Sequence, residues 1–364
     1  PFTDPSWREM LGHYSEMFSA MGLDSVPADQ WQFHPLDGYY ESVAASLPEV
    51  DLTNLYMISG SNEPLHQDPE ALAVSRNVNS KLHFAEHAPQ AGLPVPRTEV
   101  YSKRAIREGE ADRMFSELPN GVMVKLLGLA GSRNVFAVDS VADCLDQIVE
   151  YDDAVQILLQ EKLDISQWRE MTVDLTITPQ DVSISNVRQI LFAGGKWVGN
   201  YISPELEVPE AHKAVLMQVG AYARDHGHVA KEGINCGIDY FVSGDEVIVT
   251  EINARWTGGL FPAEFLRRLA ITQPAVAFFD MVPEAQSEAV RTFQREHLFP
   301  AAGDSFAYVP MGFTPFAMEI EGAERYFVWQ IVVGDFASFV EAKRQALTED
   351  AFPTAELILQ EALS

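Results

Sequence analysis

Residues 249–259 read VTEINARWTGG, a stretch that begins like a buried β-strand and ends like a tight turn. Successive side chains of a strand point to opposite faces of its sheet. One face would carry the small or apolar side chains of Thr250, Ile252 and Ala254. The other face would carry an acid, an amide and a guanidinium, from Glu251, Asn253 and Arg255. The fold and the function both depend on what these three polar groups bind.

The preceding segment, INCGIDYFV at 234–242, predicts a β-hairpin with this strand through the turn SGDE. Asp239 would then lie beside Glu251 across the hairpin, with Asn253 on the same face. Two carboxylates and an amide oxygen suit Mg²⁺, which takes one or two carboxylates and completes its shell with phosphate oxygens and water. The hairpin alone equally allows a solvent-facing strand on which Glu251 and Arg255 pair with each other.

The composition is that of a soluble globular protein with two or three packed units, since the chain has 364 residues and 47% are hydrophobic. No apolar run approaches the roughly 20 residues that cross a bilayer. The N-terminal PFTDPSWREM lacks the features of a signal peptide. The cysteines, Cys144 and Cys236, are far apart and have no metal-like spacing. These features predict a reduced, cytoplasmic setting.

The charge is strongly acidic, with 53 Asp and Glu against 25 Lys and Arg and a net charge of −28. Such a field repels nucleic acids and anionic membranes, so neither is expected as a partner. A solvated acidic surface, suited to solubility or to a salty cytoplasm, is the favoured interpretation. Attraction of a cationic substrate is the alternative. A protein of this charge that binds a polyanion must concentrate its few positive residues in one place.

Hydrophobic periodicity and turn signals predict an α+β protein with mostly antiparallel sheets rather than a βαβ array. Helices are expected within 7–22, 70–91, 139–150, 210–230 and 263–270 and at the C-terminus. Strands are expected at 55–60, within 92–101, and at 121–128, 155–163, 171–178, 187–193, 234–242, 247–255, 306–310 and 325–333. Two prolines in GLPVPRTEVY favour a domain boundary near residue 95.

A second candidate segment is VMVKLLGLAGSRNVFAV at 122–138, where a strand that carries Lys125 runs into a loop of small residues. Small residues let backbone N–H groups approach phosphate oxygens, and a lysine supplies a positive charge. The segment is not a Walker A loop, because no GKS or GKT follows. Taken alone, it is better explained as an ordinary hairpin loop. The small residues of the loop are Gly128, Ala130, Gly131 and Ser132.

A third candidate is LLQEKLD at 158–164, where an apolar strand ends in Glu161, Lys162 and Leu163. A strand that links two lobes can present its backbone groups to the edge of an adenine, while Leu163 packs on the base. A strand end that turns into solvent explains the segment equally well.

The order of these segments carries more information than any one of them. The sequence resembles the ATP-grasp superfamily over roughly residues 75–270, and NSKLHFAEHAPQAGLPVP at 79–96 resembles the helix and strand that lead into the ATP-grasp module. The features that carry the resemblance are, in order, Lys125, the glycine-containing hairpin, the EKL segment, Arg188, Asp239, Glu251 and Asn253. The resemblance implies an α+β, ATP-grasp fold, in which two α+β lobes clasp ATP and an N-terminal α/β domain precedes them.

The resemblance also implies a division of the chain into four parts. Residues 1–95 would form the N-terminal pre-ATP-grasp, substrate-binding domain, and residues 96–170 the small lobe with a lid over the phosphates. Residues 171–290 would form the large lobe with the metal site, and residues 291–364 a C-terminal α+β extension that completes it. Residues 271–364 contain no motif of the family that we could match.

By matching position, the resemblance assigns a nucleotide site. The α- and β-phosphates would contact Lys125, and Lys81 would approach the nucleotide. A loop that contains Gly128, Gly131 and Ser132 would close over the triphosphate. Glu161, Lys162 and Leu163 would hold the adenine. An acid would bind the ribose, with Glu170 assigned and Asp164 as the alternative.

The metal and catalytic residues follow in the same way. Mg²⁺, or Mn²⁺ in its place, would be bound by Asp239, Glu251 and Asn253. Arg188 and Arg255 would stabilise the transferred phosphoryl group or hold a substrate carboxylate. The turn after Arg255 and the helix expected next also offer free N–H groups for a carboxylate. The substrate residues are thus expected to be Arg255, Thr257, Gly258 and Gly259.

The implied function is that of an ATP-dependent carboxylate–amine ligase, for amino acids or peptides. It would form an amide through an acylphosphate and release ADP and phosphate. Its partners would be a small carboxylate and a small amine, with a homodimer allowed. An ATP-grasp carboxylase or purine-pathway type of enzyme is one alternative, weakened by the lack of a biotin-carrying domain. A non-catalytic ATP-binding regulatory protein is another, against which the intact metal set argues.

Overall fold

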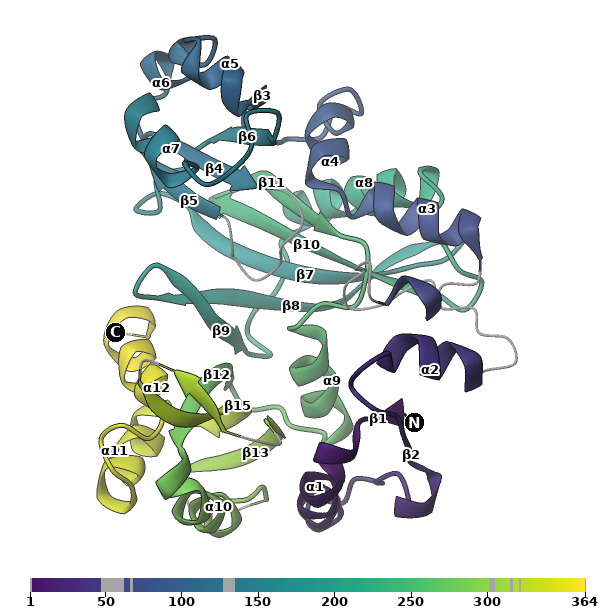
Figure 1. Ribbon diagram of the computed structural model, residues 1–364, viewed down its shortest axis with the longest axis vertical. Helices are drawn as coiled ribbons and strands as arrows, with labels where there is room; N and C mark the ends of the chain where they lie inside the picture. The colour runs from purple at the N-terminus through teal and green to yellow at the C-terminus, as the bar shows by residue number, and fades with distance from the viewer. Residues whose placement is uncertain are drawn as a thin grey trace.

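The structure is a computed structural model that describes residues 2–46, 62–65, 68–126, 135–300, 305–314, 317–320 and 322–363. Within these ranges the strands form a two-stranded, a four-stranded and a nine-stranded sheet, and helices cover the larger two (Figure 1). The predicted α+β class is confirmed. The strand expected at 55–60 and the loop residues Gly128, Gly131 and Ser132 lie outside the described residues. No helix in the described part has the length and apolar character that a membrane span needs.

The four-stranded sheet forms the small lobe, at the top of Figure 1, and all its neighbouring strands are antiparallel. Its strand order is β3 (Thr98–Ser102), β6 (Gln156–Glu161), β4 (Val122–Leu126) and β5 (Val135–Val138). Its helices are α5 (Lys103–Arg107), α6 (Asp112–Glu117) and α7 (Val141–Gln147). Ile106, Met114 and Val124 are buried between the sheet and these helices, which fixes Lys125 on a strand of a well-packed lobe.

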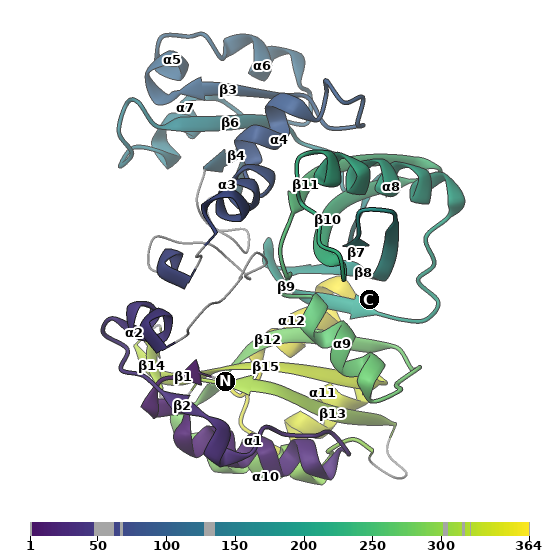
Figure 2. The same ribbon diagram turned by 90° about the vertical axis from the view of Figure 1, so that its right-hand side faces the viewer.

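The nine-stranded sheet is antiparallel throughout and runs through the rest of the molecule. Its first half has the order β11 (Glu246–Asn253), β10 (Ile234–Ser243), β7 (Arg169–Ile177), β8 (Val182–Ala193) and β9 (Lys196–Ile202). Its second half continues with β12 (Ala275–Pro283), β15 (Ala323–Gly334) and β13 (Phe306–Phe313), with β14 (Met318–Ile320) beside β15. Strands from the predicted ranges 171–290 and 291–364 therefore belong to one sheet (Figure 2).

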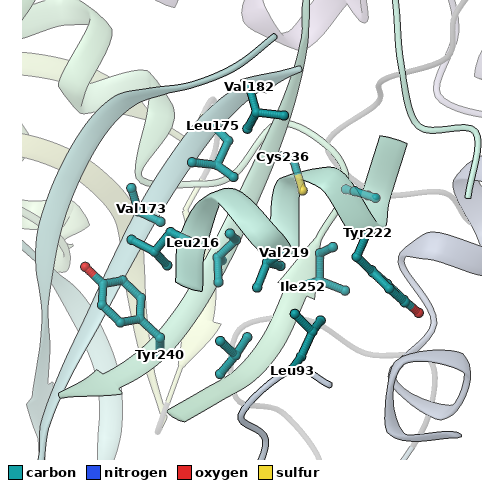
Figure 3. Close-up of a cluster of buried hydrophobic side chains, with 14 of the residues drawn as sticks. Leu93, Val173, Leu175, Val182, Leu216, Val219, Tyr222, Cys236, Tyr240 and Ile252 are labelled. Carbon is teal, nitrogen blue, oxygen red and sulfur yellow. The ribbon is translucent and has the colours of Figure 1, made fainter. Parts of the chain in front are cut away.

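The first half of this sheet is covered by α8 (Glu210–Asp225), whose apolar side packs on β7 and β10 (Figure 3). Leu216 and Val219 of α8 meet Val173 and Leu175 of β7 in this core. Two further helices, α3 (Pro69–Val78) and α4 (Lys81–His87), lie beside it. This core holds the strands of the Asp239–Glu251 hairpin in place.

The second half is covered on both faces. Its helices are α9 (Leu260–Arg268), α10 (Ser287–Glu296), α11 (Phe336–Ala346), α12 (Pro353–Leu357) and the N-terminal α1 (Arg8–Ala20). Val276 and Phe278 of β12 are buried on the side of α10 and α11, whereas Ala275 and Ala277 are buried on the side of α9. The N-terminal segment adds α2 (Tyr39–Ser46) and a parallel pair of strands, β1 (Phe2–Thr3) and β2 (Gln32–Phe33). Short 3-10 or π turns are Pro5–Trp7, Ala28–Gln30, Glu63–Leu65, Glu284–Gln286 and Ile358–Ala362.

The single helix expected over 70–91 is wrong, because the structure has two helices there. α3 ends at Val78 and α4 begins at Lys81. The Ser80 hydroxyl accepts a hydrogen bond from the His83 N–H at 3.2 Å, which is the N-cap of a new helix. The apolar spacing continues across the break, so it hides this cap. The break places Lys81 at the start of α4, where it reaches the hairpin.

The expected alternation along VTEINARWTGG is also wrong at one residue. Asp239 pairs with Glu251, but the next residue, Tyr240, pairs with Val249, so that Thr250 forms a β-bulge. Ile252 and Ala254 are buried in the core as expected, and Val249 takes the core position instead of Thr250. The bulge turns the Thr250 carbonyl toward Lys125, which donates to it at 3.4 Å.

Candidate active site

A cavity of about 540 Å³ lies between the small-lobe sheet and the first half of the large sheet. Its size falls in the usual range for small-molecule sites, roughly 300–1,000 Å³. Apart from the alternative ribose acid Asp164, every sequence-predicted site residue that the structure describes lines this cavity: Lys81, Lys125, Glu161, Lys162, Leu163, Glu170, Arg188, Asp239, Glu251, Asn253, Arg255, Thr257, Gly258 and Gly259. The fold thus brings together residues that are up to 178 positions apart, from Lys81 to Gly259.

The hairpin supplies a set of hard oxygen atoms. Asp239 and Glu251 are directly opposite each other on β10 and β11. The Asn253 amide nitrogen donates to Asp239 Oδ2 at 3.0 Å, and Asn253 Oδ1 is buried without a hydrogen-bond partner in the described part of the chain. A buried amide oxygen without a partner is costly unless it binds something else. Its place beside two carboxylates fits a divalent cation such as Mg²⁺.

The carboxylates alone would not enclose a metal, since no three His, Cys, Asp or Glu side chains cluster as ligands among the residues described. Mg²⁺ does not need such a cage, because it keeps water and takes phosphate oxygens from its substrate. The donor set of Asp239, Glu251 and Asn253 therefore fits a cation that is bound together with a polyphosphate.

Two lysines face these acids. Lys81 forms an ion pair with Glu251, and the buried Lys125 lies close to the same hairpin. Burial lowers the pKa of Lys125 to about 8. Burial also acts to raise the pKa of Glu251, but the charges of Lys81 and Lys125 outweigh it and lower that pKa to about 2. The chain thus concentrates positive charge at this point, as binding of a polyanion to so acidic a protein requires.

The pKa values of the other two acids, Glu170 and Asp239, are raised instead of lowered. Burial, with the negative charge of Asp239, raises the pKa of Glu170 to about 8. Burial, with the negative charge of Glu251, raises the pKa of Asp239 to about 6. Crowded carboxylates whose pKa values are pushed apart are typical of functional sites. An added cation would relieve the repulsion among Glu170, Asp239 and Glu251.

Arg188 is fixed by a buried ion pair that the sequence did not reveal. Its Nη1 donates to Asp174 Oδ2 at 2.6 Å, and the two side chains are 1% and 0% exposed. Asp174 also accepts from Asn235 Nδ2 at 2.9 Å and from Thr257 Oγ1 at 3.0 Å. A Cβ at Gly259 would lie 2.4 Å from Arg188 Nε, so a glycine is needed where the chain passes the guanidinium. The one sequence signal for this network is Asp174 itself, an acid between two threonines on the polar face of the alternating strand.

Arg255 is held by a residue from the α3–α4 break. Its Nη1 donates to Asn79 Oδ1 at 2.8 Å, while Asn79 Nδ2 donates to the Ala254 carbonyl at 2.9 Å. Asn235 Nδ2 donates to the Arg255 carbonyl at 2.8 Å. Since Glu251 pairs with Lys81 instead, the structure does not contain the simple surface pair of Glu251 and Arg255 that the strand alone allowed.

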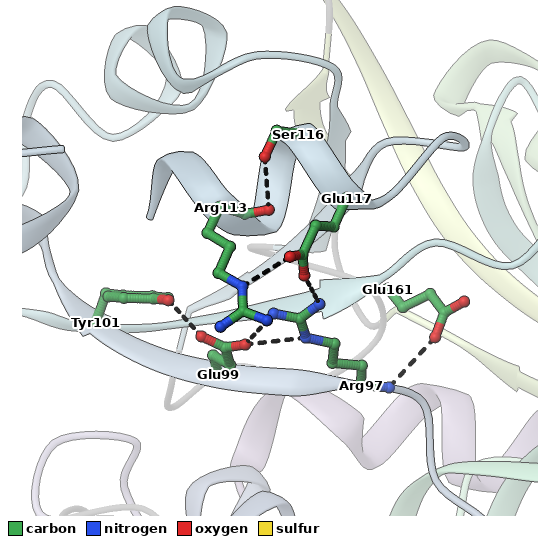
Figure 4. Close-up of polar contacts among 7 residues, drawn as sticks. All are labelled: Arg97, Glu99, Tyr101, Arg113, Ser116, Glu117 and Glu161. Atoms are coloured by element: carbon green, nitrogen blue, oxygen red, sulfur yellow. Dashed lines mark hydrogen bonds and ion pairs between the residues drawn. The ribbon is translucent and has the colours of Figure 1, made fainter. Parts of the chain in front are cut away.

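The EKL segment begins at the carboxyl end of β6, an inner strand of the small-lobe sheet. The Glu161 N–H donates to the Arg97 carbonyl at 2.8 Å, and the Arg97 N–H donates to Glu161 Oε2 at 3.4 Å. The Arg97 guanidinium is itself fixed, since it donates hydrogen bonds of 2.6 Å to both Glu99 and Glu117 (Figure 4). Lys162 and Leu163 follow and are half-buried along the cavity, so the segment does not simply turn into solvent.

The two candidate ribose acids differ in position. Asp164 accepts hydrogen bonds from the Ser166 N–H at 2.9 Å and from Gln167 Nε2 at 2.9 Å, which close its own turn. Glu170, on β7, lines the cavity. The geometry therefore favours Glu170 over Asp164 for contact with a ligand there.

No protein-family model matches the sequence, and no curated protein matches it. Solved structures match the fold. One is the biotin carboxylase domain of the Hydrogenobacter thermophilus 2-oxoglutarate carboxylase in complex with MgADP and bicarbonate, with a TM-score of 0.59 and 12% identity over 94% of this chain and 88% of that one. Another is N5-carboxyaminoimidazole ribonucleotide synthetase from Thermus thermophilus, with a TM-score of 0.57 and 12% identity over 96% of this chain and 98% of that one.

A third match is phosphoribosylamine–glycine ligase from Thermotoga maritima, with a TM-score of 0.54 and 16% identity over 98% of this chain and 95% of that one. At such identities the matches show the fold alone. The chain therefore has the ATP-grasp fold that the order of its motifs indicated.

Proposed function

We propose that the chain is an ATP-dependent carboxylate–amine ligase that joins an amino acid or a similar acid to an amine. The observation that carries this proposal is the meeting, in one cavity, of two lysines, a set of carboxylate and amide oxygens, and two anchored arginines. A polyphosphate, a divalent cation and a reacting carboxylate each find a suitable group there. The match to solved ATP-grasp structures supports the nucleotide part of the proposal.

In this proposal the nucleotide spans the cavity from the EKL segment to the hairpin. Leu163 packs on the adenine and Glu170 binds the ribose. The Leu163 N–H is available for the base, since it has no backbone partner in the part of the chain that the structure describes. Lys125 and Lys81 bind the phosphates. The closing roles of Gly128, Gly131 and Ser132 stay predictions from the sequence.

Mg²⁺ would be held by Asp239, Glu251 and Asn253, whose partnerless amide oxygen supports this assignment. The same oxygen atoms would accept Mn²⁺. When bound, the cation neutralises negative charge on the phosphates during phosphoryl transfer.

The chemistry divides into two displacements. A carboxylate oxygen of the substrate attacks the γ-phosphorus of ATP, the bond from that phosphorus to the bridging oxygen breaks, and ADP leaves. The amine nitrogen then attacks the carbonyl carbon of the acylphosphate. The bond from this carbon to the bridging oxygen breaks, phosphate leaves with that oxygen, and the amine loses a proton. Arg188 and Arg255 stabilise the charge that develops on the phosphoryl oxygens and the carboxylate. Exclusion of water protects the acylphosphate from hydrolysis.

The fold does not choose among related reactions, since the similar structures include a carboxylase domain and two enzymes named for aminoimidazole and phosphoribosylamine substrates. We favour the ligase of amino acids or peptides because Arg255 stands beside the turn that leads into α9. That turn, Thr257 to Gly259, lines the cavity and can receive a second carboxylate.

The test is ADP release from MgATP with a panel of acids and amines, followed by mass spectrometry of the products. We expect ADP release that depends on one acid and one amine together, with an amide as the product. ADP release with bicarbonate alone would favour the carboxylase alternative. Nucleotide binding without turnover across the panel would favour a regulatory protein.

Replacement of Lys125 by Ala is expected to raise the KM for ATP about tenfold or more, because a hydrogen bond to a charged group contributes about 1.5–3 kcal/mol. Steady-state ADP release at varied ATP measures the change. Lys103, whose ammonium binds the Val149 and Tyr151 carbonyls on the far side of the small lobe, is the matched control. A KM that is the same in Lys125→Ala and Lys103→Ala would refute the phosphate contact.

Nucleotide affinity is expected to fall as the pH rises through about 8, because two groups with a pKa near that value lose their protons. Lys125 loses the positive charge that attracts the phosphates, and Glu170 gains a negative charge that repels them. Calorimetric titration with a non-hydrolysable ATP analogue over this range measures the effect, and Glu170→Gln should make the fall shallower. An affinity that does not change through this range would show that neither group meets the nucleotide.

A further inference from the structure

Four aromatic side chains form a continuous surface on the second half of the large sheet, which we name the aromatic wall: Trp197, Phe279, Phe327 and Trp329. Phe279 of β12 is directly opposite Trp329 of β15, and their rings stack with centroids 5.1 Å apart and planes at 21°. Phe279 also stacks on Phe327 at 5.2 Å and 20°. Trp197 of β9 meets Phe279 edge-on at 5.2 Å.

The wall lies on the same face of the sheet that α9 covers at the start of β12. Ala275 and Ala277 point to the same side of β12 as Phe279 and are buried under α9. Phe279 and Trp329 are only half-buried, and Phe327 is 38% exposed. Large neighbouring aromatic side chains that stay partly exposed mark a binding surface more often than a random feature of a surface.

The wall reaches the candidate active site through one of its residues and extends from there toward a neighbour of Arg255. Trp197 itself lines the cavity together with Arg188. At its other end, Trp329 contacts Phe261 of α9 at 5.8 Å, and Phe261 contacts Trp256 at 5.9 Å. Trp256 is 47% exposed and stands between the cavity-lining residues Arg255 and Thr257. A chain of ring contacts thus runs from Trp197, which lines the cavity, to Trp256, the sequence neighbour of Arg255.

We propose that the aromatic wall binds the apolar side chain of the carboxylate substrate, so that the substrate is an aromatic or branched aliphatic acid or amino acid. This inference rests on the proposed function, since it places the carboxylate at Arg188 and Arg255 and the side chain on Trp197 and its neighbours. The wall consists of carbon-rich rings, and its residue Trp197 lines the same cavity as the two arginines.

The geometry of the rings favours an apolar group over a cation. A cation binds the face of an aromatic ring, where the quadrupole is negative, and is repelled by the ring edge. Phe279, which contacts all three other rings of the wall, stacks on both Trp329 and Phe327, and this leaves its edge for a ligand. Ring edges pack well against aromatic and aliphatic groups. At Phe279 the wall therefore offers an apolar group a better contact than a cationic side chain, which the acidic surface alone would attract.

The test is calorimetric titration of the full chain, with ADP and Mg²⁺ present, with three carboxylates that differ at one end. The probes are 3-phenylpropionate, succinate and 5-aminopentanoate. We expect 3-phenylpropionate to bind about tenfold more tightly than the other two, because its ring gains aromatic contacts in addition to buried apolar area. Trp329→Ala should remove most of this preference. Leu357→Ala, at an exposed apolar residue of α12, should keep it.

Equal binding of the three probes, or tighter binding of 5-aminopentanoate, would overturn the proposal. If Trp329→Ala does not fold, Phe327→Ser at the exposed end of the wall decides the question, and an unchanged preference there would also overturn it. If analytical ultracentrifugation shows a dimer that Phe327→Ser converts to a monomer, a second copy of the chain covers the wall. This result would also overturn the proposal. Binding does not need turnover. A preference for 3-phenylpropionate without any ADP release would therefore refute the proposed ligase function but support the role of the aromatic wall in binding.

Discussion

Replacement of Glu251 by Gln is expected to reduce ATP-dependent turnover on the order of 10³-fold, the upper range for removal of one preorganised electrostatic group from an active site. Gln keeps the size of the side chain but removes its charge. The proposed ligands of the cation then include one carboxylate instead of two, and Lys81 loses its ion-pair partner. Steady-state ADP release measures the effect, and circular dichroism checks that the fold is retained.

Glu246 offers a matched control on the same strand, since it is exposed and lies at the turn end of β11. Glu246→Gln should keep wild-type turnover. If Glu251→Gln also keeps it, Glu251 does not hold a catalytic cation and the proposed metal site is wrong.

Replacement of Arg188 by Met is expected to destabilise the protein by about 3–5 kcal/mol, because it leaves Asp174 as an uncompensated buried charge. Asn235 and Thr257 would still donate to Asp174, but neither carries a positive charge. Urea unfolding, followed by circular dichroism, measures the change in the free energy of unfolding. The variant should also lose turnover, since Arg188 lines the cavity.

The ion pair of Arg107 and Asp153 provides the comparison, because its side chains are 51% and 42% exposed. Arg107→Met should cost no more than about 1 kcal/mol, as is usual for surface ion pairs. An equally small cost for Arg188→Met would mean that Asp174 is not held by its arginine. The double replacement of Arg188 and Asp174 by apolar residues should recover part of the loss.

The sequence predicted the fold where the pattern is local. The turn SGDE sets the register of the β10–β11 hairpin as far as the Tyr240–Val249 pair, and the β-bulge at Thr250 then places Asp239 opposite Glu251. The order of the motifs then predicted which residues would share a cavity, although Arg188 and Asp239 lie in the middle of their strands. The β-bulge at Thr250 escaped prediction, although its one sign in the sequence is a shift of the buried apolar positions from Val247 and Val249 to Ile252 and Ala254.

The residues that anchor the site could not be predicted in this way. Asn79 meets Arg255 across 176 positions, and Asn235 meets Asp174 across 61. Their types are common in loops and strand ends, so they carry no signal until the fold brings them together. The Ser80 cap was the available clue to Asn79, and it was obscured by the apolar spacing around it.

The aromatic wall shows the same limit. Trp197, Phe279 and Trp329 come from three strands of the large sheet, and β9, β12 and β15 become neighbours only through their order in that sheet. The segment from 271 onward contains no motif to indicate this order. Only the register that places Phe279 opposite Trp329 reveals the surface they form.

The most direct test of the ligase is the transfer of oxygen-18 from a labelled carboxylate to phosphate. The enzyme would be given MgATP, an amine, and a pool of aromatic and aliphatic acids labelled in both carboxylate oxygens. We predict that the released phosphate contains one labelled oxygen, since the acylphosphate breaks between the carbonyl carbon and that oxygen. Phosphate without label, formed together with ADP, would contradict the acylphosphate route and with it the proposed function.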